Sequence, residues 1–147
     1  MPVLIGGRGQ LGKLLKQRID DLPQDVNVYH TWQVADKSES TQKIEYEKFK
    51  KFVDENVGKY IVFISTASQR NTWYSHYKQL SESYLLTKCQ KGIVIRLPTF
   101  IGKPSKLFLP EESIEVYGKV ELISIEDAVD KIVEICNSNT ILKSFDV

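Results

Sequence analysis

The sequence has few of the residues that hold metal ions or form disulfides. It contains two cysteines and two histidines. Neither Cys89 nor Cys136 lies in a Cys-x-x-Cys pair or beside a histidine. Metal sites and disulfide frameworks need such clusters, so we expect no metal site. Buried free thiols and a reducing, cytoplasmic location are expected instead.

Charge of one sign and long hydrophobic runs are also scarce. The net charge is +1, which gives no electrostatic basis for binding nucleic acid or an acidic membrane surface. No apolar run approaches the roughly 18 residues of a membrane span. The first residues lack the charged region and the long apolar region of a signal peptide. We therefore expect neither a nucleic-acid partner nor a membrane partner.

What remains is the composition of a folded domain. The chain has 147 residues, of which 41% are hydrophobic and 27% charged, and this predicts a single domain over residues 1–147. Patterns typical of strands and helices alternate, which predicts a three-layer α/β fold with a reduced, mainly parallel sheet. Helices are expected over 10–20, 41–57 and 73–89 and from 125. Strands are expected over 3–5, 26–32, 60–64, 92–97, 114–117, 120–123 and 141–147.

Two helices carry finer expectations. In the helix over 41–57, the apolar stripe is expected to be buried and to contain Tyr46, Phe49, Phe52, Val53 and Val57. Glu45 belongs to the charged face of that helix, which is expected to face water. Ser124 is expected to cap the helix that begins at Ile125.

The opening stretch, Val3–Gly12, joins an apolar strand to a helix through a turn rich in glycine. Its glycines have the spacings Gly7-x-Gly9-x-x-Gly12 and Gly6-x-x-Gly9-x-x-Gly12. Glycine lets a backbone turn sharply and approach a pyrophosphate, and the free N–H groups at a helix start favour negative charge. The stretch therefore predicts nucleotide or dinucleotide binding. The alternative is a turn that only joins a strand to a helix.

The end of the second strand bears on the type of cofactor. In a dinucleotide-binding fold an acidic residue there holds the ribose hydroxyls and favours NAD. Here the strand ends in Tyr29-His30-Thr31-Trp32, without an acid. Arg8, in the glycine turn, could meet a 2′-phosphate. These features mildly favour NADP, although Arg8 could equally be a solvated side chain.

A second informative stretch places Tyr74 and Lys78 four residues apart in a predicted helix, and therefore on one face. An ammonium group beside a phenol lowers the pKa of the tyrosine, which could then act as a general acid or base near neutral pH. Thr66 ends the preceding strand and could hydrogen-bond the same substrate oxygen. Strand ends are where open α/β sheets place their ligands. The alternative is an ordinary pair on a helix surface.

Taken together, these stretches resemble the short-chain dehydrogenase/reductase superfamily, and within it the extended branch of sugar-nucleotide epimerases, dehydratases and reductases. The matching segments follow the family order. They are the glycine turn over 6–12, the strand end over 63–68, the Tyr-x-x-x-Lys-x-x-x-Glu pattern of Tyr74, Lys78 and Glu82, the stretch Arg96-Leu97-Pro98 to Gly102, and residues 122–128.

The resemblance implies a Rossmann-like NAD(P)-binding domain. It assigns catalysis to Thr66, Tyr74 and Lys78. It assigns the cofactor to Gly6, Arg8, Gly9, Gln10, Leu11, Gly12, Thr31, Lys78, Leu97 and Thr99. The implied activity is reduction or epimerisation at a carbonyl or hydroxyl of a nucleotide-linked sugar, in surface polysaccharide synthesis.

The chain departs from that family in length. Between the strand over 26–32 and the strand at 60 there is room for one helix, where members of the branch fit two further strands. Residues 103–147 form a reduced substrate-side region, which a homodimer could complete. Three hypotheses therefore remain at this stage: a compact enzyme, a non-catalytic module that binds a dinucleotide or nucleotide-sugar as a regulator or partner subunit, and a purely structural α/β domain.

Overall fold

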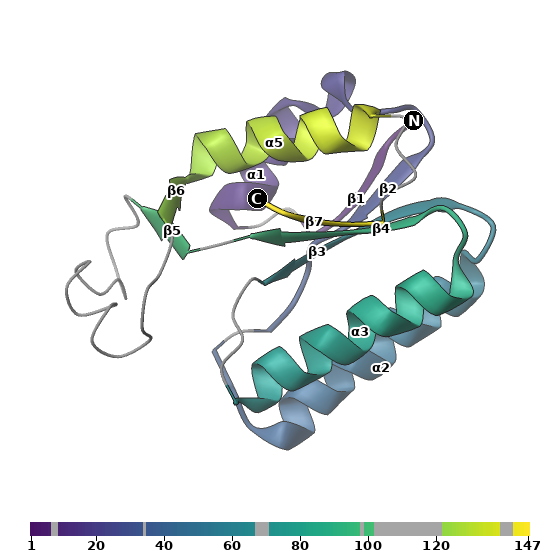
Figure 1. Ribbon diagram of the computed structural model, residues 1–147, viewed down its shortest axis with the longest axis vertical. Helices are drawn as coiled ribbons and strands as arrows, with labels where there is room; N and C mark the ends of the chain where they lie inside the picture. Colours follow the sequence, from purple (N-terminus) through teal and green to yellow (C-terminus); the bar gives the residue numbers. More distant parts are fainter. Residues whose placement is uncertain (7–8, 34, 67–70, 98, 102–121, 139–142) are drawn as a thin grey trace.

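The computed structural model describes residues 1–6, 9–33, 35–66, 71–97, 99–101, 122–138 and 143–147. Its described elements form three layers, with the sheet in the middle (Figure 1). The helices α1 (Gln10–Gln17) and α5 (Ile125–Asn137) cover one face of the sheet. The helices α2 (Glu39–Glu55) and α3 (Trp73–Lys88) cover the other face. The predicted three-layer α/β class is confirmed.

The main sheet has five strands, all parallel, in the order β1-β2-β3-β4-β7. They are β1 (Val3–Ile5), β2 (Val26–Tyr29), β3 (Tyr60–Thr66), β4 (Gly92–Leu97) and β7 (Ser144–Asp146). A separate parallel pair is formed by β5 (Thr99–Ile101) and β6 (Leu122–Ser124). A short 3-10 helix (Ile19–Asp21) follows α1. Because all five strands are parallel, their carboxyl ends meet at one edge of the sheet.

Most predicted elements lie where the sequence pattern places them, with differences at their ends. The strand over 26–32 stops at Tyr29, and the helix predicted to begin at Thr41 begins at Glu39. Ser38 caps that helix by accepting a hydrogen bond from Thr41 N. Ser124 caps α5 as predicted, accepting from Asp127 N at 3.1 Å. The strand predicted over 114–117 lies outside the described residues.

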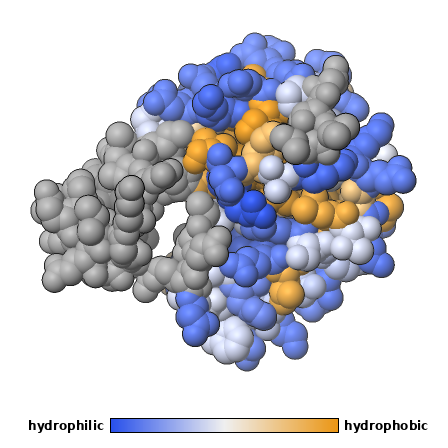
Figure 2. All heavy atoms as spheres, in the orientation of Figure 1, coloured by the Kyte–Doolittle hydropathy of each residue, from blue (hydrophilic) through white to orange (hydrophobic). Residues whose placement is uncertain are grey.

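Each face of the sheet has its own hydrophobic core. On the α1 and α5 side, Leu15 and Ile132 are fully buried against strand residues such as Ile95. On the α2 and α3 side, the rings of Phe49 and Phe63 lie 4.4 Å apart. Figure 2 shows hydrophobic side chains gathered along the sheet layer, between the more polar outer surfaces of the helices.

Two expectations for α2 are wrong. Val57, expected in the buried stripe, lies beyond the helix end and is 45% exposed. Glu45, expected to face water, is only 8% exposed. The buried face of the helix in fact consists of Gln42, Glu45, Phe49 and Val53, so its spacing is helical but its first half is polar.

The connections between the strands do not all have the same hand. The strands β1 to β4 follow one another across the sheet in a single direction. The hand of each crossover therefore depends only on which face of the sheet its connecting helix covers. Helices α2 and α3 cover one face and α1 covers the other (Figure 1). Since nearly all such crossovers are right-handed, the first one, β1–α1–β2, is the unusual left-handed kind. A right-handed crossover through α1 would lead to the opposite edge of β1, where no described strand pairs.

Candidate functional site

The glycine turn begins with a residue that requires glycine for a reason internal to the chain. Gly6 has a φ of 100°, in the region that L side chains rarely adopt. A Cβ added there would lie 2.8 Å from Thr31 N and 3.0 Å from His30 Nδ1. The end of β2 approaches this closely because the backbone N–H groups of His30 and Thr31 both donate to Ile5 O, at 2.9 and 3.1 Å. Glycine at position 6 thus leaves room for the residues that follow β2.

Gly9 is different, because a Cβ added there would meet nothing within 4 Å. It is the N-cap of α1 in an extended conformation, and among the described residues no side chain caps this helix. The first turn, with exposed Gln10 and buried Leu11 and Gly12, holds no acidic residue. Its N–H groups therefore suit an anion. The candidate Arg8 lies outside the described residues.

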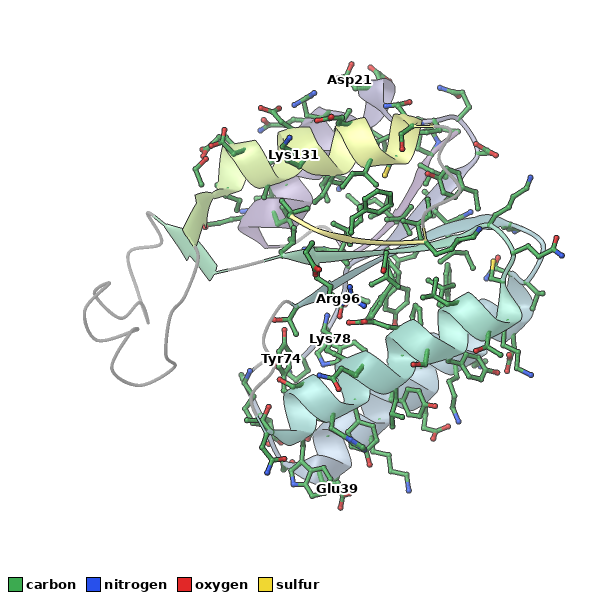
Figure 3. The ribbon with its side chains drawn as sticks, viewed as in Figure 1. Asp21, Glu39, Tyr74, Lys78, Arg96 and Lys131 are labelled. Carbon is green, nitrogen blue, oxygen red and sulfur yellow. The ribbon has the colours of Figure 1, made fainter. Side chains whose placement is uncertain are left out.

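Helix α3 brings the predicted Tyr and Lys to the end of β3. The N-cap Thr72 accepts from Ser75 N at 3.1 Å, so the helix begins directly before Tyr74. The side chains of Tyr74 and Thr66, the last residue of β3, form a hydrogen bond. The Lys78 amine lies 5.8 Å from the centre of the Tyr74 ring. The three predicted catalytic residues are therefore brought together, and Figure 3 shows Tyr74 and Lys78 between the sheet and α3.

The predicted low pKa of Tyr74 is wrong for this arrangement. Burial raises the pKa of the phenol, and the hydrogen bond with Thr66 lowers it by less. At neutral pH the phenol is therefore protonated and able to donate a proton. The spacing correctly predicts that Lys78 and Tyr74 are neighbours, but burial has the largest effect on the pKa of the phenol.

Lys78 is 5% exposed, and its Nζ donates to Ile64 O at 3.0 Å. The amine also lies 4.7 Å from the ring centre of Trp32 and 4.9 Å from that of Phe63. Burial lowers the pKa of Lys78 to about 7, although the carboxylates of Glu82 and Glu45 oppose that change. The amine is therefore partly deprotonated at neutral pH.

A partly buried ion pair fixes α3 to the sheet one turn beyond Lys78. Arg96, on β4, donates through Nε and Nη2 to Glu82 Oε1, at 3.0 and 2.7 Å. Ser65, beside Thr66 on β3, donates to the other Glu82 oxygen at 2.6 Å. Arg96 also forms an ion pair with Asp146 of β7 at 3.4 Å. These contacts join one helix to three strands and so position the turn that carries Tyr74 and Lys78.

Two residues that were not among the predicted site residues, Gln42 and Glu45, hold the connection after β2 near Lys78. Gln42 accepts from Trp32 Nε1 at 2.7 Å and donates to Gln33 O at 2.9 Å. Glu45 accepts from Gln33 N at 2.6 Å. They belong to the buried face of α2, which consists of residues 42, 45, 49 and 53. These residues are three, four and four positions apart, which is the spacing of one helix face. That spacing was the signal available in the sequence.

The other predicted cofactor residues lie on the same edge of the sheet but differ in exposure. Thr31 is exposed beside the glycine turn. Leu97 ends β4 and is buried in the core on the α1 and α5 side. Thr99 begins β5, and the structure describes its backbone position only. Among the described residues no cluster of His, Cys, Asp or Glu could hold a metal ion, and no described helix is long and apolar enough to cross a membrane.

Comparisons with known proteins identify the fold. No protein-family model and no curated protein matches the sequence. Among solved structures, the chain is similar to the dTDP-4-dehydrorhamnose reductase of Bacillus anthracis in complex with NADP. The two are 16% identical with a TM-score of 0.68, over 99% of this chain and 73% of the reductase.

Two enzymes of Bordetella bronchiseptica, both in complex with NAD, are also similar. WbmG is 13% identical with a TM-score of 0.68, over 99% of this chain and 71% of WbmG. WbmH is 18% identical with a TM-score of 0.57, over 90% of this chain and 55% of WbmH. At these identities the likeness shows a shared fold, the one found in these dinucleotide-bound enzymes.

The close approach to Gly6 leads to a stability prediction. Gly6→Ala should lower the free energy of unfolding by about 3 kcal/mol, because the added Cβ meets backbone atoms at a positive φ. Gly58→Ala, whose Cβ would meet nothing within 4 Å, should change it by less than about 1 kcal/mol. Urea denaturation followed by circular dichroism measures both. Equal effects of the two variants would contradict the packing described for the turn.

The Glu82–Arg96 pair leads to a second prediction. Glu82→Gln should lower the free energy of unfolding by about 3 kcal/mol, because it leaves the Arg96 charge without its buried partner. Glu134→Gln is the matched control, because Glu134 also forms an ion pair, with Lys131 at 3.5 Å, but on the exposed surface of α5. It should change stability by about 0.5 kcal/mol or less. The same urea titration compares them, and a mild effect of Glu82→Gln would mean that α3 is fixed by other contacts.

Proposed function

We propose that the chain is an NAD(P)-dependent enzyme of the short-chain dehydrogenase/reductase type. Its proposed substrate is a carbonyl or hydroxyl group of a nucleotide-linked sugar, and its proposed setting is surface polysaccharide synthesis in the cytoplasm. One observation carries this proposal: Thr66, Tyr74 and Lys78 converge at the edge of the sheet where the parallel strands end. Helix α1, which no described side chain caps, follows the glycine turn at the same edge. Open α/β sheets bind ligands at this edge.

The residues of the glycine turn fit a dinucleotide in part. Gly9 leaves open space in front of the first turn of α1, whose N–H groups would hold the pyrophosphate. The space beside Gly6 is already taken by His30 and Thr31. When bound, the nicotinamide would supply or accept a hydride. A preference for NADP over NAD rests on Arg8 and is part of the proposal.

The proposed role of Tyr74 is to give a proton to the substrate oxygen. Its phenol is protonated at neutral pH, because burial raises its pKa, so it suits the reductive direction, in which a carbonyl oxygen gains a proton. Thr66 would hold the same oxygen through its hydroxyl. Lys78 lies beside the Tyr74 ring, and its amine, with a pKa of about 7, could return a proton to the phenolate.

The second candidate function is a non-catalytic module that binds a dinucleotide or nucleotide-sugar. A specific observation favours it: β1, which leads into the glycine turn, is the edge strand of the described sheet. In the usual order of doubly wound folds, 3-2-1-4-5-6, the first strand has neighbours on both sides. A ligand on this turn would therefore have little protein on one of its sides.

Ligand binding and turnover separate these functions. Calorimetric titration should give micromolar binding of NADPH or NADH, and Gly9→Val should weaken it at least about tenfold, because a side chain there would project into the proposed pyrophosphate site. Folding should survive this change, since nothing lies within 4 Å of the new Cβ. Absence of binding by either dinucleotide to the folded protein would contradict the oxidoreductase proposal.

If turnover is found with a nucleotide-sugar, Tyr74→Phe should lower kcat by about a hundredfold or more, because general acid catalysis is lost. Tyr84→Phe is the matched control. Tyr84 lies on the same helix, but its hydroxyl bonds Asp54 on the surface of the helix pair, so kcat should be unchanged. Binding without turnover, or turnover unaffected by Tyr74→Phe, would favour the module.

A homodimer is also part of this proposal, with the free edge of β1 as the proposed contact. Val3 is 47% exposed, and Val3–Ile5 carries no charge that would oppose pairing of two edges. Light scattering after gel filtration should give the mass of a dimer for the natural chain and of a monomer for Val3→Lys. Ile44→Lys, an exposed change on α2, is the control and should leave the dimer intact. A monomeric natural chain would contradict this contact.

A further inference from the structure

His30 occupies an unusual place for a polar side chain. It directly follows β2, and its backbone N–H is bound to Ile5 O, so its ring lies against the glycine turn. Its Nδ1 atom is buried and has no hydrogen-bond partner of acceptable geometry within the described part of the chain. The Gly6 backbone interacts with the ring and raises its pKa, but by less than burial lowers it. Buried polar atoms without partners are rare in folded proteins, which suggests that a ligand interacts with this ring.

Lys78 is a second basic group, and its charge acts on His30. Burial lowers the pKa of His30, and the charge of Lys78 lowers it further, so the two side chains oppose each other's protonation. The Lys78 amine has three N–H groups, and the hydrogen bond to Ile64 O uses one of them. The amine therefore retains donors for a ligand.

The charged groups that face Lys78 do not neutralise this pair. Glu82, on the same helix, is bound to Ser65 and Arg96. Glu45, on α2, is bound to the backbone of Gln33 and lies 3.7 Å from the Lys48 amine. Lys37, in the connection before α2, adds a further positive charge that lowers the pKa of Lys78. Tyr74, whose phenol is neutral, also lies beside the amine.

We propose that His30 and Lys78 together bind a phosphate group of a diphosphate ligand, and that the site takes up a proton from solvent as the anion binds. The negative charge would offset the repulsion between the two cations, so that both could be protonated at once. No bond is made or broken apart from those to the transferred proton. The diphosphate of NAD(P) and that of a nucleotide-sugar share this chemistry. The inference rests on the proposed function only for the choice between NAD(P) and a nucleotide-sugar as the source of the diphosphate.

The test measures proton uptake directly. Inorganic pyrophosphate, NADPH and UDP-glucose are titrated separately into the natural chain by calorimetry in PIPES, HEPES and Tris at one pH near 7.5. Because the buffers release protons with different heats, uptake by the protein makes the observed heat depend on the buffer. We expect uptake for pyrophosphate and for at least one of the other two ligands. Affinity should fall as pH rises, by up to about tenfold per pH unit.

His30→Gln is the informative variant, because glutamine retains polarity but does not titrate. It should abolish most of the uptake and weaken pyrophosphate binding about tenfold, whereas His76→Gln, on an exposed histidine, should change neither. Nuclear magnetic resonance of labelled histidine provides a measurement that does not depend on the variant's folding. The pKa of His30 should rise on adding pyrophosphate, and the signals of the exposed His76 should not respond to it.

The outcomes separate this inference from the proposed function. Binding of NADPH without proton uptake would contradict the inference and leave the oxidoreductase proposal standing. Uptake with pyrophosphate and UDP-glucose but no binding of NADPH or NADH would support the inference and contradict the oxidoreductase proposal. No binding of pyrophosphate, or uptake that is the same in His30→Gln, would overturn the inference.

Discussion

The burial of the Lys78 amine is the constraint on which much of this structure depends. Lys78 lies beneath the end of β2, with its amine against Ile64 O and the Trp32 ring. A charged amine in such a place is costly, so the folded chain favours its neutral form. In the unfolded chain its pKa is 10.5, and in the folded chain it is about 7. Between these values folding releases a proton, so this group's contribution to stability increases as the pH rises from 7 toward 10.5.

Because burying this amine opposes folding at any pH below its ordinary pKa of 10.5, most strongly below 7, other contacts must hold the amine in place. The Glu82–Arg96 pair fixes the helix that carries Lys78, and Gln42 fixes the Trp32 ring above it. Both sets of contacts use polar groups that are themselves largely buried and well bonded. Proteins usually retain such costly arrangements at sites that bind ligands or do chemistry. The same reasoning makes the β3–α3 region the most constrained part of the site.

The sequence predicted this region better than the rest, for physical reasons. Helical spacing alone places Tyr74 and Lys78 on one face, and the strand end places Thr66 near them. Spacing does not report burial, which is why the pKa of Tyr74 and the exposure of Glu45 were predicted wrongly. The left-handed first crossover was also beyond the sequence patterns. They locate β1, α1 and β2 but contain no information on which edge of β1 the next strand joins.

That crossover changes what the glycine turn can be taken to mean. Because β2 pairs directly with β1, the end of β2 packs against Gly6. The close approach of His30 and Thr31 is therefore enough to explain why this position has no Cβ. Of Gly6 and Gly9, it is Gly9 that leaves space for a ligand. The glycine pattern is therefore weaker evidence for a nucleotide than its spacing implies. A further argument for an anion comes from two side chains that the pattern does not contain, because the charge of Lys78 lowers the pKa of His30 and a bound anion would relieve this repulsion.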